Sequence, residues 1–311
     1  IDVFAMQGQL PTSPDDTTDH TIFSDVVAGT DKPVIAYTRV SQNVTADGLA
    51  FQAKAGLPFV QTLPAAVRSL QALIKYSAAR DRGVVPLPEP TGARASLEGA
   101  TFEALLAQHG LTPPASGLGA TAQQAAIEAA RIGFPVALKI VSPQAGHKTE
   151  VGGVALGLMD EAAVVAAADE MAARLAALEP DAVIEGFLVQ EMVSGVEMIV
   201  GVREDPQFGP FMVVGLGGVM VEAMRDIAFR MLPLTTADAQ AMLDELQGKA
   251  LLGEFRGRPA PDIEALVKAM VGLSALFLGH RTHLADLEVN PLIVGGIGEG
   301  VRAVDVRPVF K

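Results

Sequence analysis

Acidic and amide side chains alternate along one short segment near the carboxyl end of the chain. Asp286, Glu288 and Asn290 occupy every second position. In a β-strand their side chains therefore lie on one face, and Leu287 and Val289 lie on the other. Such a face presents hard oxygen donors on a rigid element.

A further oxygen donor, Asp305, interrupts the apolar segment Ala303–Val306, which we expect to be a second strand. Converging side-chain oxygens suit Mg²⁺, and nucleotide phosphates and water would complete its six ligands. The alternative is an exposed acidic strand face, but the break in an otherwise apolar strand at Asp305 argues against it.

Lys139 lies inside the apolar segment Val136–Val141. Burying an ammonium group is costly unless an anion pairs with it, and a phosphate would serve. A lysine on an edge strand that points into solvent explains the same pattern equally well.

The segment that follows, residues 142–153, contains His147, Lys148 and the pair Gly152 and Gly153. Glycines let backbone amides approach a ligand closely, and a neutral imidazole can accept a phosphoryl group near pH 7. A solvated loop histidine is the plainer interpretation of this segment taken alone.

Residues 189–197 predict a strand that ends near Val193 and a new strand that carries Glu197. The backbone at 191–193 could pair with an adenine edge, and the Glu197 carboxylate could bind ribose hydroxyls. An ordinary hairpin with one exposed glutamate gives the same pattern.

The glycine-rich residues 215–218 join two predicted strands and do not open a helix, so they form neither a Walker A loop nor a dinucleotide fingerprint. We interpret them as a structural turn. Downstream, Glu222, Asp226 and Arg230 recur at a spacing of four, which we interpret as a solvated helical ladder of ion pairs.

Composition excludes several classes of protein. The 311 residues are 50% hydrophobic, with a mean hydropathy of +0.34, which rules out a disordered or fibrous chain. The net charge is −13. A strongly acidic chain argues against nucleic-acid binding. The absence of cysteine excludes disulfides, thiolate metal sites and a thiol nucleophile. Without cysteine, a cytoplasmic location is the default expectation. Apolar segments 211–221 and 269–279 are too short to span a bilayer, so we expect no membrane contact.

Three regions can be distinguished by their patterns. Residues 1–82 alternate strands and helices, which predicts a parallel sheet with right-handed crossovers. Residues 83–96 are rich in proline and glycine and are the best candidate for a linker. The rest, 97–311, alternates groups of strands with separate helices, which predicts α+β layers with antiparallel pairing. The strands expected in the first region are 1–5, 33–37 and 57–60, and its helices are 43–55 and 64–82.

In the last region helices and strands are expected on either side of short glycine turns. Thr121, Asp160 and Thr235 or Thr236 are suitable N-caps. The helices expected there are 98–109, 121–132, 161–178, 236–248 and 262–279. The strands are 136–141, 153–159, 183–192, 196–203, 211–216, 284–289 and 301–306.

Four of these segments resemble the ATP-grasp domain of the NDP-forming acyl-CoA synthetases, relatives of succinyl-CoA synthetase. They are Val136–Leu158, Val189–Val202, Asp205–Arg230 and Leu287–Ile293, and the resemblance covers about residues 95–311. Residues 1–82 resemble the later part of the flavodoxin-like ligase domain of fused members. The fold class implied is α/β, with a partial flavodoxin-like parallel-sheet domain followed by an α+β ATP-grasp domain.

The resemblance implies a reaction and a set of site residues. Family members convert an acid, CoA and ATP reversibly into acyl-CoA, ADP and phosphate, through an acyl phosphate and a phosphohistidine. Motif position implies His147 as the relaying histidine and Arg230, more weakly, as a contact of the transferred phosphate. It implies nucleotide binding by Lys139, Gly152, Gly153, Gln190, Glu191, Val193 and Glu197, and Mg²⁺ binding by Glu288, Asn290 and Asp305.

The resemblance also implies partners. We expect ATP or ADP and Mg²⁺ as cofactors, CoA as a co-substrate of the complete enzyme, and an oligomer. No CoA-binding Rossmann domain or upstream histidine motif is evident, and His20 lies in a polar stretch unlike that motif. We therefore expect the CoA-binding and histidine-bearing part to precede this sequence or to be another subunit. A carboxylate–amine ligase of the same fold and a non-catalytic nucleotide-binding module remain the alternatives.

Overall fold

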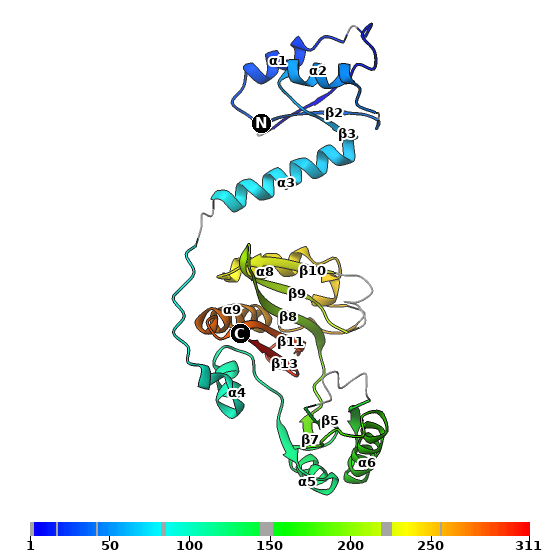
Figure 1. The fold of residues 1–311 in the computed structure, drawn as a ribbon, viewed down its shortest axis with the longest axis vertical. Helices are drawn as coiled ribbons and strands as arrows, with labels where there is room; N and C mark the ends of the chain where they lie inside the picture. The colour runs from blue at the N-terminus through cyan, green and yellow to red at the C-terminus, as the bar shows by residue number, and fades with distance from the viewer. Residues whose placement is uncertain are drawn as a thin grey trace. The chain divides into compact units, whose positions relative to one another are not determined.

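The chain folds into two compact units, Ile1–Val85 and Pro86–Lys311, shown as a ribbon in Figure 1. The structure is a computed structural model. It describes residues 3–16, 18–41, 43–81, 85–143, 152–218, 226–255 and 257–311.

The first unit is a three-stranded parallel sheet with helices on both faces. Its strands run in the order β1-β2-β3, which confirms the predicted parallel sheet. Helices α1 and α2 cover one face and α3 lies against the other (Figure 1). The strands are β1 Phe4–Gln7, β2 Val34–Thr38 and β3 Phe59–Gln61, and the helices are α1 Thr21–Ala28, α2 Ala46–Ala55 and α3 Leu63–Asp81.

Three aromatic rings form the core of this unit. Phe23, Phe51 and Phe59 meet edge to face, with ring centroids 5.0–5.9 Å apart, an arrangement that aromatic pairs favour. The short helix α1 was not predicted, because its eight residues are only about two helical turns, too few to establish a helical period.

The second unit begins with an extended segment that lies on the last long helix, α9 (Ile263–His280). The Gly92 N–H donates to the carbonyl of Gly279 at 2.8 Å, and Arg281 donates to the carbonyl of Pro88 at 3.2 Å. The Ser96 hydroxyl lies 2.9 Å from Nε2 of the buried His280. This part of the proline-rich segment is therefore attached to the second unit.

A small sheet with two helices forms one half of the second unit. Its four antiparallel strands run in the order β4-β7-β5-β6, and α5 and α6 pack on one face around Leu138, Val189 and Ala125. The predicted caps Thr121 and Asp160 are confirmed, since each side chain accepts a backbone N–H of its own helix. The elements are β4 Ser116–Gly119, α5 Ala122–Ile132, β5 Val136–Val141, β6 Val154–Leu158, α6 Glu161–Leu178 and β7 Gly186–Glu191.

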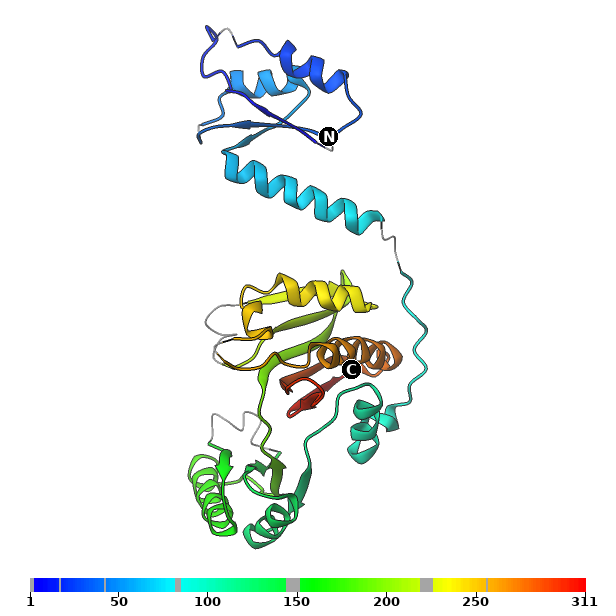
Figure 2. The same cartoon turned by 180° about the vertical axis from the view of Figure 1, so that it is seen from behind.

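The other half is a six-stranded antiparallel sheet with helices on one face only, as Figure 2 shows from the helix side. Strands run in the order β10-β9-β8-β11-β12, and β13 also pairs with β11. The elements are η1 Arg94–Leu97, α4 Gly99–Gln108, β8 Val196–Asp205, β9 Gly209–Leu216, β10 Ile227–Met231, α8 Thr236–Glu245, η2 Lys249–Leu252, α9, β11 Leu284–Val294, β12 Val301–Ala303 and β13 Val306–Phe310.

Helix α9 is the central element of the core beneath this sheet. Its Leu266, Met270, Leu273 and Phe277 are fully buried, in one cluster with Val200, Leu287 and Val289. Within the described residues it is the one helix whose length and mean hydropathy, 1.4 over 18 residues, would suit a membrane span. Its burial identifies it as the core helix of a globular unit.

Two local predictions are wrong, and one short strand was missed. Ile227–Met231 is a strand paired with β9, not part of a helical ladder, because the pairing satisfies its backbone in the sheet. The segment 301–306 is two strands, and Asp305 lies in the break between β12 and β13. β4 was missed because Ser-Gly-Leu-Gly has low strand propensity.

Candidate nucleotide and metal site

Two side chains of the four-stranded sheet meet one backbone carbonyl of the half that contains the six-stranded sheet. The Lys139 Nζ donates to the carbonyl oxygen of Val304 at 3.3 Å, and the Gln190 Nε2 approaches the same oxygen at 3.5 Å. Strand β5 lies between β7 and β6, so Lys139 is on an interior strand and the edge-strand interpretation is wrong. The two sheets are thus joined at the residue that precedes Asp305.

Gln190 carries an unsatisfied acceptor. The residue is 8% exposed, and within the described structure its Oε1 is buried without a hydrogen-bond partner. The carbonyl of Val304 can only accept, which orients the Nε2 toward it and leaves Oε1 as the free acceptor. A buried acceptor without a partner costs free energy, and a donor group on a bound ligand would satisfy it.

The backbone at residues 191–193 has one available donor. The N–H groups of Glu191 and Met192 donate to the carbonyls of Ala115 and Pro135 at 2.8 and 3.3 Å. In the described part of the chain no hydrogen bond from the Val193 N–H is found. The Glu191 carboxylate accepts the Ala115 N–H at 3.3 Å.

Glu197 lies at the start of β8, where the glycine turn 215–218 closes on it. The Gly217 N–H donates to the Glu197 carbonyl at 2.6 Å. A Cβ at Gly218, whose φ is +66°, would lie 2.9 Å from the Glu197 Oε2. The turn predicted as structural thus borders the carboxylate that we expect to bind ribose, and it leaves that carboxylate exposed.

The predicted oxygen donors converge across β11 and the β12–β13 break. The Asn290 N–H donates to the Asp305 carbonyl at 2.9 Å, and the Asn290 Nδ2 donates to the Glu288 Oε1 at 3.1 Å. The Asn290 Oδ1 therefore remains as an acceptor. A register shift in β11 between Val289 and Leu292 lies at this point, and such bulges often redirect side chains near active sites.

This donor set fits Mg²⁺. Glu288, Asn290 and Asp305 offer carboxylate and amide oxygens, the ligands that Mg²⁺ accepts. The described residues contain no group of three His, Cys, Asp or Glu side chains able to form a closed metal cage. An open set is what Mg²⁺ uses when phosphates and water supply the other ligands.

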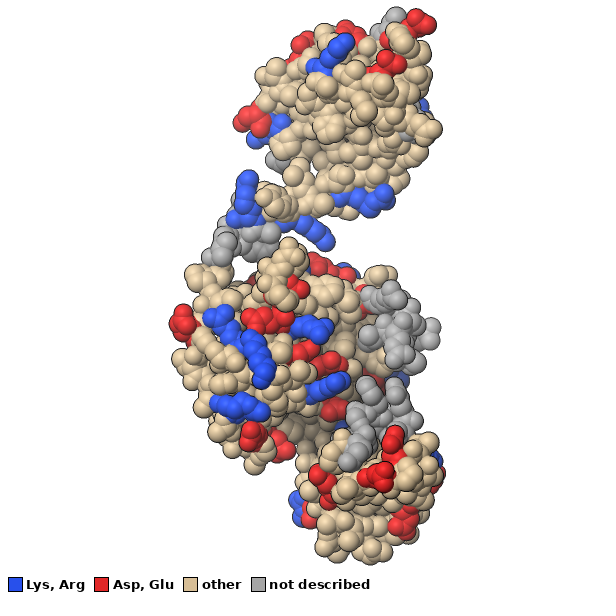
Figure 3. All heavy atoms as spheres, viewed as in Figure 1, with Lys and Arg blue, Asp and Glu red and all other residues tan. Residues whose placement is uncertain are grey.

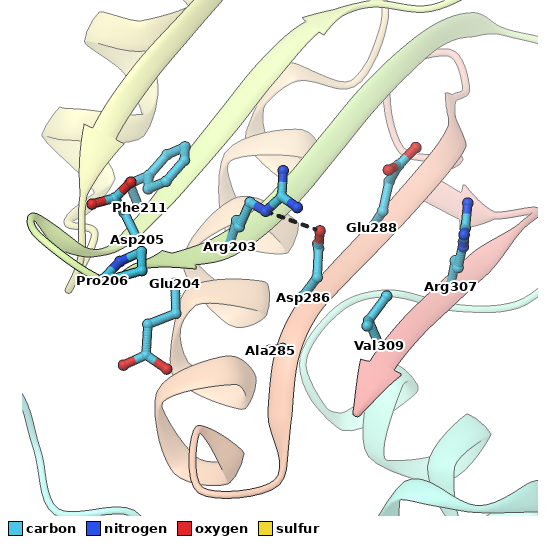
Figure 4. A pocket seen from close by; sticks show the side chains of 10 residues that line it. All are labelled: Arg203, Glu204, Asp205, Pro206, Phe211, Ala285, Asp286, Glu288, Arg307 and Val309. Atoms are coloured by element: carbon cyan, nitrogen blue, oxygen red, sulfur yellow. Dashed lines mark ion pairs between the residues drawn. The ribbon is translucent and has the colours of Figure 1, made fainter. Parts of the chain in front are cut away.

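A pocket of about 820 Å³ adjoins this set on the open face of the large sheet (Figure 4). Glu288 lines it, together with Asp286, which forms an ion pair with Arg203 at 3.7 Å. Burial raises the pKa of Asp286, Arg203 opposes the change, and the neighbouring Glu288 adds to it. Figure 3 shows acidic and basic side chains intermingled on this face of the molecule.

Arg230 lies on the other face of the sheet. It is opposite Met212, a core residue, and forms a two-point ion pair with Glu245 of α8 at 2.8 and 3.2 Å. Nearby, the buried Asp226 accepts the N–H groups of Gln247 and Gly248, both at 2.8 Å. The structure thus uses both residues to attach β10 to the helices, and it does not bring Arg230 to Lys139 or Asn290.

Gly152 and Gly153 lead into β6. The Gly153 carbonyl accepts the Ile140 N–H at 2.9 Å, next to Lys139. Gly152 has a φ of +65°, and a Cβ there would overlap the Arg174 guanidinium. His147, Lys148 and Glu222 lie outside the described residues.

Sequence reasoning missed three contributors to the site. The Val304 carbonyl gives no sequence signal, because any residue has one. Arg203 and Arg307 line the pocket from β8 and β13, and their alternation with Gly201 and Asp305 at every second position was the available signal.

Two antiparallel sheets that meet at one point, with a lysine on the first and oxygen donors beside the second, are typical of a class of ATP-dependent enzyme domains. Residues 90–309 match the family described as ATP-grasp domain. The chain is 36% identical over 208 residues to subunit beta of an ADP-forming acetate–CoA ligase II of Pyrococcus furiosus. The matched region covers 67% of this chain and 88% of that protein.

Longer relatives and solved structures match the same region. An ADP-forming acetate–CoA ligase I of Archaeoglobus fulgidus is 38% identical over 207 residues, covering 66% of this chain but 30% of that protein. A dinucleotide-forming acetyl-coenzyme A synthetase 1 of Ca. Korarchaeum cryptofilum, solved with coenzyme A and Ca-AMPCP, has a TM-score of 0.63 at 39% identity and covers 67% of this chain and 90% of that one. This chain belongs to the ATP-grasp family, within the ATP-grasp part of the ADP-forming acyl-CoA synthetases.

Proposed function

We propose that this chain binds Mg-ATP or Mg-ADP between its two sheets and relays a phosphoryl group through His147 to or from an acyl phosphate. The observation that carries the proposal is the convergence of Lys139 and Gln190 on Val304, one residue before Asp305. The groups suited to phosphate, base and metal thereby lie around one segment, Val304 and Asp305.

Each residue has a separate task in the proposed site. The Gln190 Oε1 accepts from the amino group of adenine, and the Val193 N–H donates to the ring. Glu197 binds the ribose hydroxyls, and Lys139 neutralises phosphate charge. Mg²⁺ held by Glu288, Asn290 and Asp305 would supply further charge neutralisation at the phosphates.

The proposed transfer forms one bond and breaks one bond. A nitrogen of the His147 imidazole bonds to the terminal phosphorus of ATP, and the bond from that phosphorus to the ADP oxygen breaks, leaving its electron pair on ADP. Lys139 stabilises the charge that accumulates on the leaving diphosphate. The reverse step makes ATP from the phosphorylated histidine.

Formation of acyl-CoA needs more than this chain in our proposal. Because the chain spans 30% of the Archaeoglobus relative, we assign the acid and CoA sites to a further domain or subunit, and residues 1–82 to the later part of a flavodoxin-like ligase domain. We also propose that the assembly is an oligomer in the cytoplasm.

Phosphate labelling tests the relay. With γ-labelled ATP and Mg²⁺, the protein should acquire label that is stable to base and lost in acid. His147→Ala should abolish labelling while Mg-ADP affinity, measured by calorimetry, stays within about threefold. His283→Ala is the matched control and should label normally.

Two other outcomes would contradict the proposal. Label that persists in His147→Ala excludes His147 as the carrier. If the wild-type protein binds Mg-ATP but acquires no label, the relay is excluded, and the chain is a carboxylate–amine ligase or a nucleotide-binding module. With the CoA-binding part supplied, a panel of acetate, longer aliphatic acids and aromatic acids then identifies the acid.

A further inference from the structure

Within the described residues, the chain passes between the two halves of the second unit at two places (Figure 1). Residues 112–115 lie between α4 and β4, and residues 192–195 lie between β7 and β8. The Glu191 N–H donates to the Ala115 carbonyl at 2.8 Å, and the Glu191 carboxylate accepts the Ala115 N–H at 3.3 Å. Two hydrogen bonds, one of them to a side chain, therefore hold the first crossing against the start of the second.

The other end of the first crossing is bonded to the six-stranded sheet. The carbonyl of Thr112 accepts the N–H of Ala303 at 2.9 Å, and Thr112 forms a parallel bridge with Arg302 of β12. The preceding residue, Leu111, is fully buried in the core of this half. Thr112 therefore has a fixed position relative to β12.

Each of these two attachments lies one residue from a group of the proposed site. Ala303 directly precedes Val304, and Glu191 directly follows Gln190. The Gln190 Nε2 and the Val304 carbonyl oxygen are the groups that approach each other to 3.5 Å. The distance between the two attachments therefore sets the distance between the two halves at the site.

Two prolines lie between the attachments. The rings of Pro113 and Pro114 fix φ near about −65°, and a residue that precedes a proline is restricted to extended conformations. Thr112 and both prolines therefore have little conformational freedom. Pro114 is buried and Pro113 is half-buried, so packing restrains them further.

We propose that residues 112–115 are a rigid brace that positions Gln190 and Lys139 against the Val304 carbonyl, and that its two prolines are positioning residues for nucleotide binding. The inference rests on the proposed function, because Gln190 and Lys139 are its base and phosphate contacts. The brace holds the two halves in place before the nucleotide arrives, so the entropy of ordering them is not lost on binding. In this proposal the Glu191 carboxylate acts on the Ala115 N–H and does not touch the nucleotide.

Nucleotide binding to the full chain tests the brace. Pro113→Gly should weaken Mg-ADP binding, measured by calorimetry, roughly twofold to fivefold, because the freed segment must be ordered when the nucleotide binds. Insertion of one glycine between Pro113 and Pro114 lengthens the segment by up to about 3 Å and should weaken binding roughly tenfold or more. The matched controls are Pro180→Gly and insertion of a glycine after Pro180, in an exposed turn of the same unit, and both should bind as wild type does.

Base preference separates positioning from a general loss of stability. Gln190 is the proposed contact of the adenine amino group, so Pro113→Gly should lower the preference for ADP over IDP. In a Gln190→Met background the same change should lower that preference little further, because the brace acts through Gln190. A preference that Pro113→Gly leaves unchanged, whatever its thermal midpoint, overturns the proposal.

Glu191 provides an independent test of the bond to Ala115. Glu191→Gln keeps an oxygen that can accept the Ala115 N–H. It should therefore retain more Mg-ADP affinity, and more preference for ADP over IDP, than Glu191→Ala. An equal loss in both variants would assign the carboxylate to a charge contact with the ligand and would overturn its place in the brace.

Wild-type binding distinguishes this inference from the proposed function. Equal Mg-ADP affinity in wild type, Pro113→Gly and the insertion variant overturns the brace and leaves nucleotide binding standing. Failure of the wild type to bind Mg-ADP overturns both.

Discussion

The backbone of Asn290 is hydrogen-bonded to the backbone of Asp305, with the N–H 2.9 Å from the carbonyl oxygen. The two residues lie 15 positions apart, on β11 and in the break after β12. Because backbone atoms make this bond, either side chain can be replaced without removing the link. The metal donors can therefore be tested separately from the fold.

Substitution of these donors should reduce the effect of Mg²⁺ on nucleotide affinity. We expect Asn290→Ala and Asp305→Asn to weaken Mg-ADP binding roughly tenfold or more, a loss of about 1.4 kcal/mol for each factor of ten. Calorimetry with and without Mg²⁺ measures the effect, and the thermal midpoint should change little. Asp181→Asn on an exposed loop is the control, and a similar loss there would argue against a specific metal site.

The unpaired Oε1 of Gln190 should select the base. Adenine presents an amino group where guanine and hypoxanthine present a carbonyl, and two facing acceptors repel while neither is satisfied. We expect wild-type protein to prefer ADP to GDP and IDP by about tenfold or more, and Gln190→Met to lose much of that preference.

Competition binding against a fluorescent ADP analogue measures the base preference. Gln240→Met on α8 is the matched control and should behave as wild type. If Gln190→Met discriminates among the three nucleotides as well as wild type does, the base does not meet Gln190.

Replacement of Gly92 by alanine should loosen the attachment of residues 86–97. A Cβ at Gly92 would lie 2.2 Å from the ring of His280, which is buried and bonded to Leu276 and Ser96. We expect Gly92→Ala to destabilise the second unit by about 1–3 kcal/mol, as overpacking usually does. Gly279→Ala, one residue before His280 with nothing near its Cβ, should be neutral or slightly stabilising.

Intrinsic fluorescence does not report on the second unit, because both tyrosines, Tyr37 and Tyr76, lie in the first unit and the chain has no tryptophan. Hydrogen exchange of α9 peptides is therefore the measurement that compares the two glycine variants. Equal exchange of α9 in Gly92→Ala and Gly279→Ala would show that the contact with His280 contributes nothing.

His109 should make the second unit less stable in acid. Burial lowers the pKa of His109 below its usual 6.5, and the nearby His280 lowers it further. The folded state therefore binds fewer protons than the unfolded state as pH falls, so stability decreases from about pH 6.5 down to the lower pKa of the folded state. Exchange of the α4 peptide between pH 7 and pH 5 should show this loss in wild type.

The variant His109→Gln should lose less stability over the same pH range. His283→Gln is the control and should follow the wild type. A pH dependence that is the same in His109→Gln would assign the acid sensitivity to other groups.

Local chemistry in the sequence was enough to predict many of the elements. The caps Thr121 and Asp160 marked the starts of two helices that the structure confirms. For a third helix the sequence offered Thr235 or Thr236, and the cap is Thr235. Alternation placed Leu287 and Val289 in the core and left Glu288 and Asn290 on the other face, as the buried fractions confirm. These features depend on neighbours within one turn of helix or a few residues of strand, so the local sequence is sufficient to predict them.

Tertiary structure alone decided which distant groups meet. The carbonyl of Val304 receives Lys139 and Gln190 because two separate sheets face each other there, and a backbone oxygen has no sequence signal. Arg307 lies opposite Glu288 through strand register, and Asp226, which the spacing assigned to a helical ladder, is a buried anchor at the start of β10. Pairing across strands and packing between sheets minimise free energy over the whole unit, so no local pattern fixes them.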